Sequence, residues 1–301
     1  MTTLRLATRG SALAIAQSDL VSAALRVGSP DLDVEYVHIT TEGDADRTTP
    51  LSVLGGRGVF VRGVEEALLR GEADIAVHSL KDMPTEDAPG LVIGAVLERA
   101  DPRDAFVGSQ GRRLAELPSG ARVGTSSQRR RALLQAMRPD LEIVELRGNV
   151  DTRLRKVADG EVDGAVLAAA GLVRLGRIGE ATQIFEAMEF LPAPGQGAIA
   201  VECRADDTAT LVLLAALEHA ATRAAVDAER GFLAALGSGC TLPVGAYAQV
   251  DGELVALRAM IADVDGRAPI FADASAPIAQ AATLGHGLGE QLRDAAAQGE
   301  S

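Results

Sequence analysis

The chain has 301 residues, a length typical of two or three domains. Hydrophobic residues make up 47% of it and charged residues 24%, which is ordinary globular usage, although aromatic residues reach only 3%. The net charge of −13 argues against a nucleic acid or an anionic membrane as partner, because both are polyanions.

The N-terminus lacks the basic-then-apolar pattern of a signal peptide, and every apolar stretch is far shorter than a bilayer span. The two cysteines, Cys203 and Cys240, are too few for a disulfide framework in a chain of this size. These features predict a cytoplasmic protein with reduced thiols and no membrane partner.

Strand-like and helix-like segments alternate through the first two thirds of the chain. Strands are predicted over 4–8, 34–40, 74–78, 122–124, 142–146, 163–168 and 199–202, and helices over 12–27, 59–69, 127–137 and 150–158. This order is typical of the α/β class, with a mainly parallel sheet covered by helices.

Two breaks, at Asp101-Pro102 and at 191–197, divide this region into two lobes joined by two chain crossings, with a hinged ligand cleft between them. We therefore predict a first domain over 1–98 plus 198–217 and a second over 103–192. A small α+β domain follows over 218–301. Its predicted helices span 220–236 and 276–297, and its strands span 246–250, 255–261 and 269–272.

A basic stretch stands out in this acidic chain. Residues 122–156 hold nine basic and four acidic side chains, which by itself also fits a solvated helical face. Arg129 and Arg130, however, fall in the first turn of a helix that follows Gly124-Thr125-Ser126-Ser127, where a cation is unfavourable unless an anion lies there. The arrangement recurs at Arg147-Gly148-Asn149 with Arg153, and at Thr8-Arg9-Gly10-Ser11. The pattern predicts a cleft for a ligand with several carboxylates or phosphates.

Two short segments could carry chemistry. His78–Pro84 places Lys81 and Asp82 at a strand end, either as a surface turn with a weak ion pair or as a carboxylate aimed into the cleft. Lys81 is notable because the chain has only two lysines. Cys240 lies in a glycine-rich loop, where it is a candidate nucleophile or attachment point or simply a small turn residue.

The remaining features are less specific. Cys203 lies in an apolar strand and is interpreted as inert packing. The segment 41–58 is either a functional lid or a flexible loop. The four histidines are scattered, and no Cys/His group has metal-ligand spacing, so no metal site is predicted.

Taken in chain order, eight segments resemble the hydroxymethylbilane synthase (porphobilinogen deaminase) family: 7–11, 55–60, 78–84, 124–130, 147–153, 170–176, 191–204 and 229–245. The resemblance implies a monomer of three domains, the first two like a type II periplasmic binding protein. It implies a dipyrromethane cofactor joined by a thioether to Cys240. It also implies a transferase of porphyrin and heme biosynthesis, which joins four porphobilinogen molecules into hydroxymethylbilane with loss of ammonia.

The resemblance further implies roles for single residues. Asp82 matches the catalytic carboxylate. The residues matching cofactor contacts are Ser79, Lys81, Thr125, Ser127, Arg129 and Arg130. Those matching groups that bind porphobilinogen and the growing chain are Arg9, Ser11, Arg147, Arg153, Arg174 and, as a covering aromatic, Phe60. The chain departs from the family pattern at Ala12, Val53 and Leu242, and past about residue 250 it resembles the family weakly.

A non-catalytic two-lobed binding protein for an acidic small molecule is the alternative. It would explain the lobes and the arginines, but it gives Cys240 no role. A nucleic-acid binder is disfavoured by the charge and by the scarcity of aromatic residues.

Overall fold

The computed structural model describes residues 3–41, 61–237, 243–262 and 268–298. Phe60, Cys240 and nearly all of the 41–58 segment therefore lie outside the described residues. The chain divides into two compact units, one of Met1–Ala100 with Ala198–Arg223 and one of Asp101–Gly197 with Ala224–Ser301. The predicted three-domain boundaries stay a prediction.

The first unit is built on a five-stranded sheet in the order β2-β1-β3-β10-β4. Strands β1 (Thr3–Arg9), β2 (Asp33–Ile39) and β3 (Ile75–Ser79) are parallel. Strand β10 (Ile199–Arg204) lies between β3 and β4 (Leu91–Val96) and runs antiparallel to both. A segment that follows residue 197 thus completes the sheet that the N-terminal segment begins.

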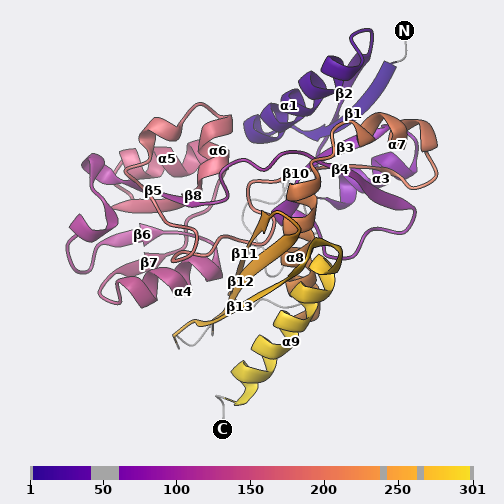
Figure 1. The fold of residues 1–301 in the computed structure, drawn as a ribbon. Coiled ribbons are helices and arrows are strands. Elements are labelled where there is room, and N and C mark those ends of the chain that lie inside the picture. Colours follow the sequence, from indigo (N-terminus) through magenta and orange to yellow (C-terminus); the bar gives the residue numbers. More distant parts are fainter. Residues whose placement is uncertain (1–2, 42–60, 238–242, 263–267, 299–301) are drawn as a thin grey trace. The chain divides into compact units, whose positions relative to one another are not determined.

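Three helices cover this sheet (Figure 1). α1 (Ala12–Gly28) and α7 (Thr208–Ala215) contribute Val21, Leu25 and Leu214 to the core on one face, and α3 (Arg62–Leu69) contributes Val64 and Leu68 to the core on the other. No single helix in the described part of the chain is long and apolar enough to cross a membrane. The pair α7 and α8 (Ala220–Ala235), bent by 111°, meets that criterion only when the two helices are taken together.

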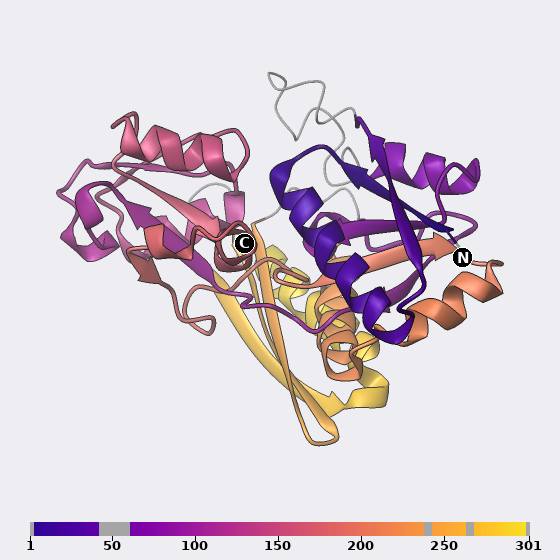
Figure 2. The same cartoon turned by 90° about the horizontal axis from the view of Figure 1, so that it is seen from above.

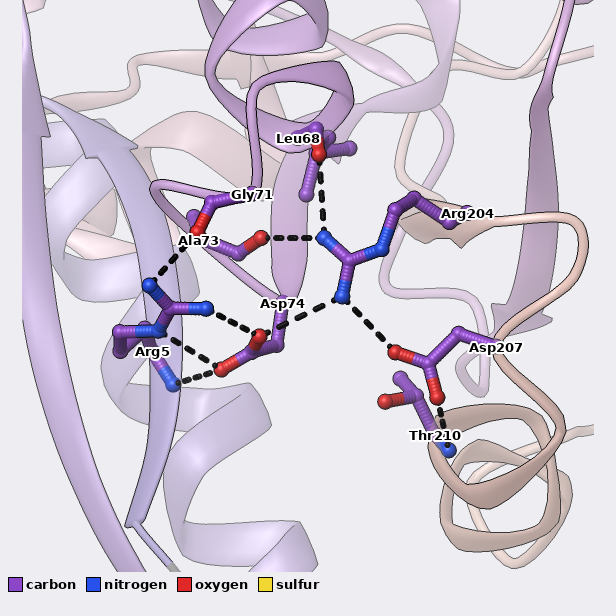
Figure 3. Close-up of polar contacts among 8 residues, drawn as sticks. All are labelled: Arg5, Leu68, Gly71, Ala73, Asp74, Arg204, Asp207 and Thr210. Atoms are coloured by element: carbon purple, nitrogen blue, oxygen red, sulfur yellow. Dashed lines mark hydrogen bonds and ion pairs between the residues drawn. The ribbon is translucent and has the colours of Figure 1, made fainter.

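A charge cluster ties the strands together where β1 and β3 begin (Figure 3). Asp74 accepts hydrogen bonds from the side chains of Arg5, at 2.7 and 3.1 Å, and of Arg204, at 3.4 Å. Arg204 also pairs with Asp207, at 2.9 Å, whose other oxygen caps α7 through the Thr210 N–H. We call Arg5, Asp74, Arg204 and Asp207 the Asp74 cluster. It anchors the end of β10 to the beginnings of β1 and β3.

The second unit contains a sheet in the order β7-β6-β8-β5-β9. β6 (Arg122–Gly124) is parallel to β7 (Glu142–Val144) and β8 (Gly164–Ala168), whereas β5 (Asp104–Gly108) is antiparallel to β8 and β9 (Gln183–Ile184). α4 (Gln128–Met137) packs on one face through Leu133 and Leu134, and α5 (Val150–Ala158) and α6 (Ala169–Arg174) pack on the other.

The rest of this unit is a three-stranded antiparallel sheet with helices α8 (Ala220–Ala235) and α9 (Ala281–Gln298) against one face (Figure 2). The strands are β11 (Val244–Asp251), β12 (Leu254–Ile261) and β13 (Ile270–Pro277). The two helices approach closely because Gly285 has no side chain to collide with the backbone oxygen of Ala228. Phe232 is fully buried in the resulting core.

The predicted α/β class with a small C-terminal α+β part is confirmed. The prediction of mainly parallel sheets is only half right, because β10 and β5 return antiparallel. β4, β5, β9, α6 and α7 were not predicted. The predicted helix over 276–297 begins too early, because β13 continues to Pro277 and α9 starts at Ala281.

Candidate functional site

In the first unit, the predicted site residues gather where the parallel strands β1 and β3 end. Ala7 pairs with Ala76, so the residues after both strands meet at one edge of the sheet. Arg9 ends β1, and Ser11 caps α1 by accepting a hydrogen bond from the Ala14 N–H at 3.2 Å. This edge therefore also carries the positive end of a 17-residue helix, which favours anions.

Asp82 lies in a single 3₁₀ turn, Leu80–Asp82, directly after β3. Two buried side chains on either side, Leu80 and Met83, anchor the turn, and the Leu80 N–H donates to the Ala198 oxygen at 3.1 Å. Lys81 and Asp82 between them stay half-buried. The turn thus presents a carboxylate that is fixed by its backbone but still accessible.

Two polar contacts hold the end of β3 below Asp82. The Ser79 hydroxyl lies 2.8 Å from Nε2 of Gln17, a buried residue of α1. On the other face, Nε2 of His78 lies 3.0 Å from a carboxylate oxygen of Glu202 on β10, and both side chains are buried. His78 consequently supports the strand, and the exposed chemistry of this segment belongs to Lys81 and Asp82.

In the second unit, the parallel strands β7, β6 and β8 likewise end at one edge. Thr125 and Ser127 follow β6, and Ser127 caps α4 with its hydroxyl oxygen. After β7 the chain turns at Gly148, whose φ of 114° disfavours a side chain, and Asn149 caps α5 by accepting from the Thr152 N–H at 2.9 Å. Two helix N-termini therefore point to the edge where the basic residues lie.

Arg147 and Arg153 lie half-buried at this edge. Nε of Arg147 is 3.6 Å from a Glu145 oxygen, and Nε of Arg153 donates to the Gly148 oxygen at 2.8 Å. Both contacts involve Nε, at the base of each guanidinium.

Arg129 and Arg130 lie deeper, around the fully buried Asp104 at the start of β5. Arg129 Nη1 and Arg130 Nη2 donate to the two Asp104 oxygens at 2.8 and 2.7 Å, and Gln196 Nε2 donates at 2.9 Å. Burial alone would raise the pKa of Asp104, but the two guanidinium charges outweigh it and hold that pKa far below its usual range. We call Asp104, Arg129, Arg130 and Gln196 the Asp104 cluster. The sequence predicted an anion at the start of α4 and assigned it to a ligand. The structure shows that the chain supplies an anion there, the Asp104 carboxylate.

Arg174 is in the opposite situation. Its Nη2 donates to the Gly197 oxygen at 2.7 Å, its buried Nε has no acceptor, and no carboxylate pairs with it among the described residues. Burial lowers the pKa of Arg174 to about 10, so it remains a cation at neutral pH. A half-buried cation that has no carboxylate partner among the described residues suits a ligand that brings a carboxylate.

Cys240 lies outside the described residues, but the elements that precede and follow it are described. α8 ends at Ala235, Gly237 follows with a φ of 86°, and β11 begins at Val244. Within α8, the fully buried Glu229 accepts hydrogen bonds from the Gly195 N–H at 2.7 Å and the Ala248 N–H at 2.8 Å. The helix that leads to the cysteine is therefore bonded to β11 and to the 191–197 segment.

Comparison with known proteins decides the family. A model described as "Porphobilinogen deaminase, dipyromethane cofactor binding domain" matches residues 4–212, and one for the porphobilinogen deaminase C-terminal domain matches 223–294. The chain belongs to the porphobilinogen deaminase family. It is a transferase that joins porphobilinogen units into hydroxymethylbilane on a dipyrromethane cofactor. The second match shows that the family likeness extends past residue 250, where the sequence motifs indicated only a weak one.

Individual relatives agree. A porphobilinogen deaminase of Roseiflexus sp. (strain RS-1) is 52% identical over 88% of this chain and 88% of its own length. One from Xanthomonas euvesicatoria pv. vesicatoria is 50% identical over 98% of this chain and 97% of its own. Among solved structures, the methionine binding protein MetQ has a TM-score of 0.45 at 16% identity, covering 71% of this chain and 89% of that one.

Proposed function

We propose that Asp82 is the catalytic carboxylate of this porphobilinogen deaminase and that Cys240 carries the dipyrromethane cofactor through a thioether. The observation that supports this most is the turn after β3, which holds the Asp82 carboxylate accessible between two buried anchors, Leu80 and Met83. The bound cofactor supplies the pyrrole carbon at which the chain grows.

Asp82 acts by electrostatics and hydrogen bonding. Loss of ammonia leaves the incoming substrate electron-poor, and a fixed carboxylate stabilises that developing positive charge. The same oxygens accept hydrogen bonds from pyrrole N–H groups and can take up a proton. Because the turn fixes its backbone, Asp82 needs little reorganisation when the charge develops.

The basic residues bind the carboxylates. Each porphobilinogen brings an acetate and a propionate, so every addition increases the negative charge that the protein must offset. We assign cofactor contacts to Ser79, Lys81, Thr125, Ser127, Arg129 and Arg130. We assign substrate and chain contacts to Arg9, Ser11, Arg147, Arg153, Arg174 and Phe60. Guanidinium groups suit this role because they bind carboxylates through two parallel hydrogen bonds.

We also propose that the enzyme works as a monomer in the cytoplasm, without a membrane or a nucleic acid as partner. The net charge of −13 supports the last point, since it repels polyanions. The size of the purified enzyme in solution, measured by light scattering, tests the first.

A paired experiment tests the two principal residues. Asp82→Asn should lower turnover at least 100-fold with an unchanged circular dichroism spectrum, a loss of about 3 kcal/mol in transition-state stabilisation. Glu86→Gln, an exposed carboxylate four residues further on, is the matched control and should retain activity. Near-normal turnover of the Asp82 variant would remove its assigned role.

The cofactor anchor is tested on the same preparations. The intact mass of the wild-type enzyme should exceed the sequence mass by two linked pyrrole units and react with Ehrlich's reagent. Cys240→Ala should show neither, whereas Cys203→Ala should show both, because Cys203 is buried in the sheet of the first unit. Cofactor mass on the Cys240→Ala protein would place the anchor elsewhere.

A further inference from the structure

The end of β3, directly before the Asp82 turn, carries two polar side chains in an otherwise apolar strand. Residues 75–77 are apolar and buried, whereas the strand closes with His78 and Ser79. Successive side chains of a strand point to opposite faces of the sheet. His78 therefore lies on the face that α3 covers and Ser79 on the face that α1 covers.

Asp82 depends on this strand end for its position, because its single 3₁₀ turn follows β3 directly. The Leu80 N–H of the turn donates to the Ala198 oxygen at 3.1 Å, and Ser79 pairs with Ile199 of β10. The backbone of β10 thus holds both the end of β3 and the beginning of the turn. A shift of β10 along β3 would move the turn as well.

β10 is paired differently with its two neighbours. Its pairing with β3 runs without interruption from Ile199 to Cys203. Its pairing with β4 shifts register between Val201 and Glu202. Irregularities of this kind re-aim side chains and are frequent next to active sites. Because the ladder to β4 is irregular at Glu202, the contacts with β3 are the ones that fix β10 there.

A buried side-chain contact joins β10 and β3 at the same point. Nε2 of His78 lies 3.0 Å from a Glu202 oxygen, and the two side chains are only 5% and 1% exposed. The contact is diagonal, because Ala200 stands opposite His78 and Glu202 stands opposite Ala76. A hydrogen bond is directional, so a slip between the strands would break this contact, whereas apolar side chains would tolerate a small one.

Glu202 is an unfavourable residue here for stability alone. Burying an acidic side chain costs its hydration, and one histidine partner offsets only part of that cost. A second acid lies nearby: burial raises the pKa of Glu65 on α3, and the charge of Glu202 raises that pKa further. Because an apolar pair would stabilise the fold at least as well, the contribution of the His78–Glu202 contact is a fixed geometry.

We propose that Glu202 is a positioning residue for the reaction: through His78 it fixes β10 against β3 and so holds the Asp82 turn in place. The inference rests on the proposed catalytic role of Asp82. Glu202 is itself buried and acts on the reaction only through His78 and the strand that carries it.

Replacing both partners separates positioning from packing. The double variant His78→Leu/Glu202→Met fills the site with apolar side chains, which is often neutral or favourable for stability, but it removes the directional contact. A misplacement of about 1 Å can cost about 100-fold in rate, so kcat should fall at least about tenfold. The matched control is Asp74→Asn, which weakens the beginning of the same strand and should keep the wild-type kcat. The urea midpoint of the double variant should be no lower than that of this control.

Two conservative variants of Glu202 test the geometry directly. Glu202→Gln keeps the length of the side chain and an acceptor oxygen for His78, so kcat should stay near the wild-type value. Glu202→Asp keeps the charge but withdraws the carboxylate by one methylene group, which breaks the 3.0 Å contact and should lower kcat about tenfold. A role that depended on the charge alone would give the opposite order.

The readout is steady-state kinetics of the full-length holoenzyme. The fraction that carries cofactor is measured by intact mass, and kcat is expressed per loaded molecule. The KM for porphobilinogen should stay within about twofold of the wild type, because the groups that bind its carboxylates are unchanged. In an Asp82→Asn background, the double substitution should lower kcat little further, because the carboxylate that the pair positions is already gone.

Each outcome decides the proposal. A wild-type kcat in the double variant or in Glu202→Asp overturns the positioning role and leaves the proposed function intact. A full additional loss in the Asp82→Asn background also overturns it, because the pair would then act through another group. Equal losses in Asp74→Asn and in the double variant reduce the effect to lost stability. A wild-type kcat in Asp82→Asn alone overturns the proposed function together with this inference. If the double variant does not fold, the order of Glu202→Gln and Glu202→Asp decides.

Discussion

The Asp74 and Asp104 clusters are built alike but differ in their third partner and in their burial. In each, one carboxylate accepts from two arginines that are far away in the sequence. The Asp74 cluster adds a second acid, Asp207, so two positive charges meet two negative ones (Figure 3). In the Asp104 cluster a neutral amide, that of Gln196, donates to the carboxylate as the third partner.

The two clusters also differ in how deeply their side chains are buried. The Asp74 side chain is 16% exposed, and Arg5 and Arg204 are 38% and 23% exposed, so water can share their hydrogen bonding. Asp104 is fully buried. A neutral, partly exposed cluster serves to join strands. Breaking a buried ion pair costs more than breaking an exposed one, because the charge that is left behind cannot be solvated. The degree of burial therefore determines how much each carboxylate contributes to stability.

The sharpest test of the comparison is the free energy of unfolding of Asp104→Asn. Removing the Asp104 carboxylate from the two buried guanidinium groups should cost about 3–5 kcal/mol, because both buried cations lose the counter-ion that they share. Urea denaturation of the apo-protein, compared with the wild type, measures the loss. A cost below about 1 kcal/mol would mean that water or a rearranged side chain compensates, and the cluster would then resemble the Asp74 cluster.

Asp74→Asn should cost less, about 1–2 kcal/mol, because its partners are partly exposed and can be solvated. The same urea denaturation detects it, with Glu86→Gln as an exposed control that should cost nothing measurable. Turnover of the loaded enzyme should stay at the wild-type level, since this cluster lies at the beginnings of β1 and β3. A loss of turnover in the folded variant would contradict the structural role.

The sequence was informative where local pattern determines structure. The helix-like patterns over 127–137 and 150–158 predicted α4 and α5 almost to the residue. Periodicity could not reveal that β5 and β10 run antiparallel, because strand direction depends on where the chain returns in space. The strand predicted over 269–272 was too short, because β13 continues to Pro277. Its small residues alone do not distinguish a strand from the start of a helix.

The candidate site divides in the same way. Asp82, Cys240 and the arginines could be singled out because residue type and neighbours carry the signal. Asp104 could not be singled out, because its partners lie far along the chain. The two arginines are 25 and 26 residues away, and Gln196 is 92 residues away. The one local hint was the placement of two arginines in the first turn of α4, which required an anion close by.

Acid titration gives the smallest and most selective difference between the clusters. The pKa of Asp74 is lowered: burial opposes the shift, and the hydrogen bonds from Arg5 and Arg204 outweigh it. The pKa of Asp104 is lowered much further, by the adjacent charges of Arg129 and Arg130. A carboxylate with a depressed folded-state pKa stabilises the fold fully above its unfolded-state pKa, about 3.9. That stabilisation declines below this pH and is gone once the pH has fallen through the folded-state pKa.

The stability penalty of Asp74→Asn should therefore vanish first as the pH falls below about 4, while part of the Asp104→Asn penalty persists, a difference of about 1 kcal/mol. Urea midpoints of wild type, Asp74→Asn and Asp104→Asn, measured in steps from pH 5 to pH 3, test this. If both penalties disappear at the same pH, the two carboxylates experience similar fields. The deeper burial of Asp104 and of its two arginine partners would then have no effect on its titration.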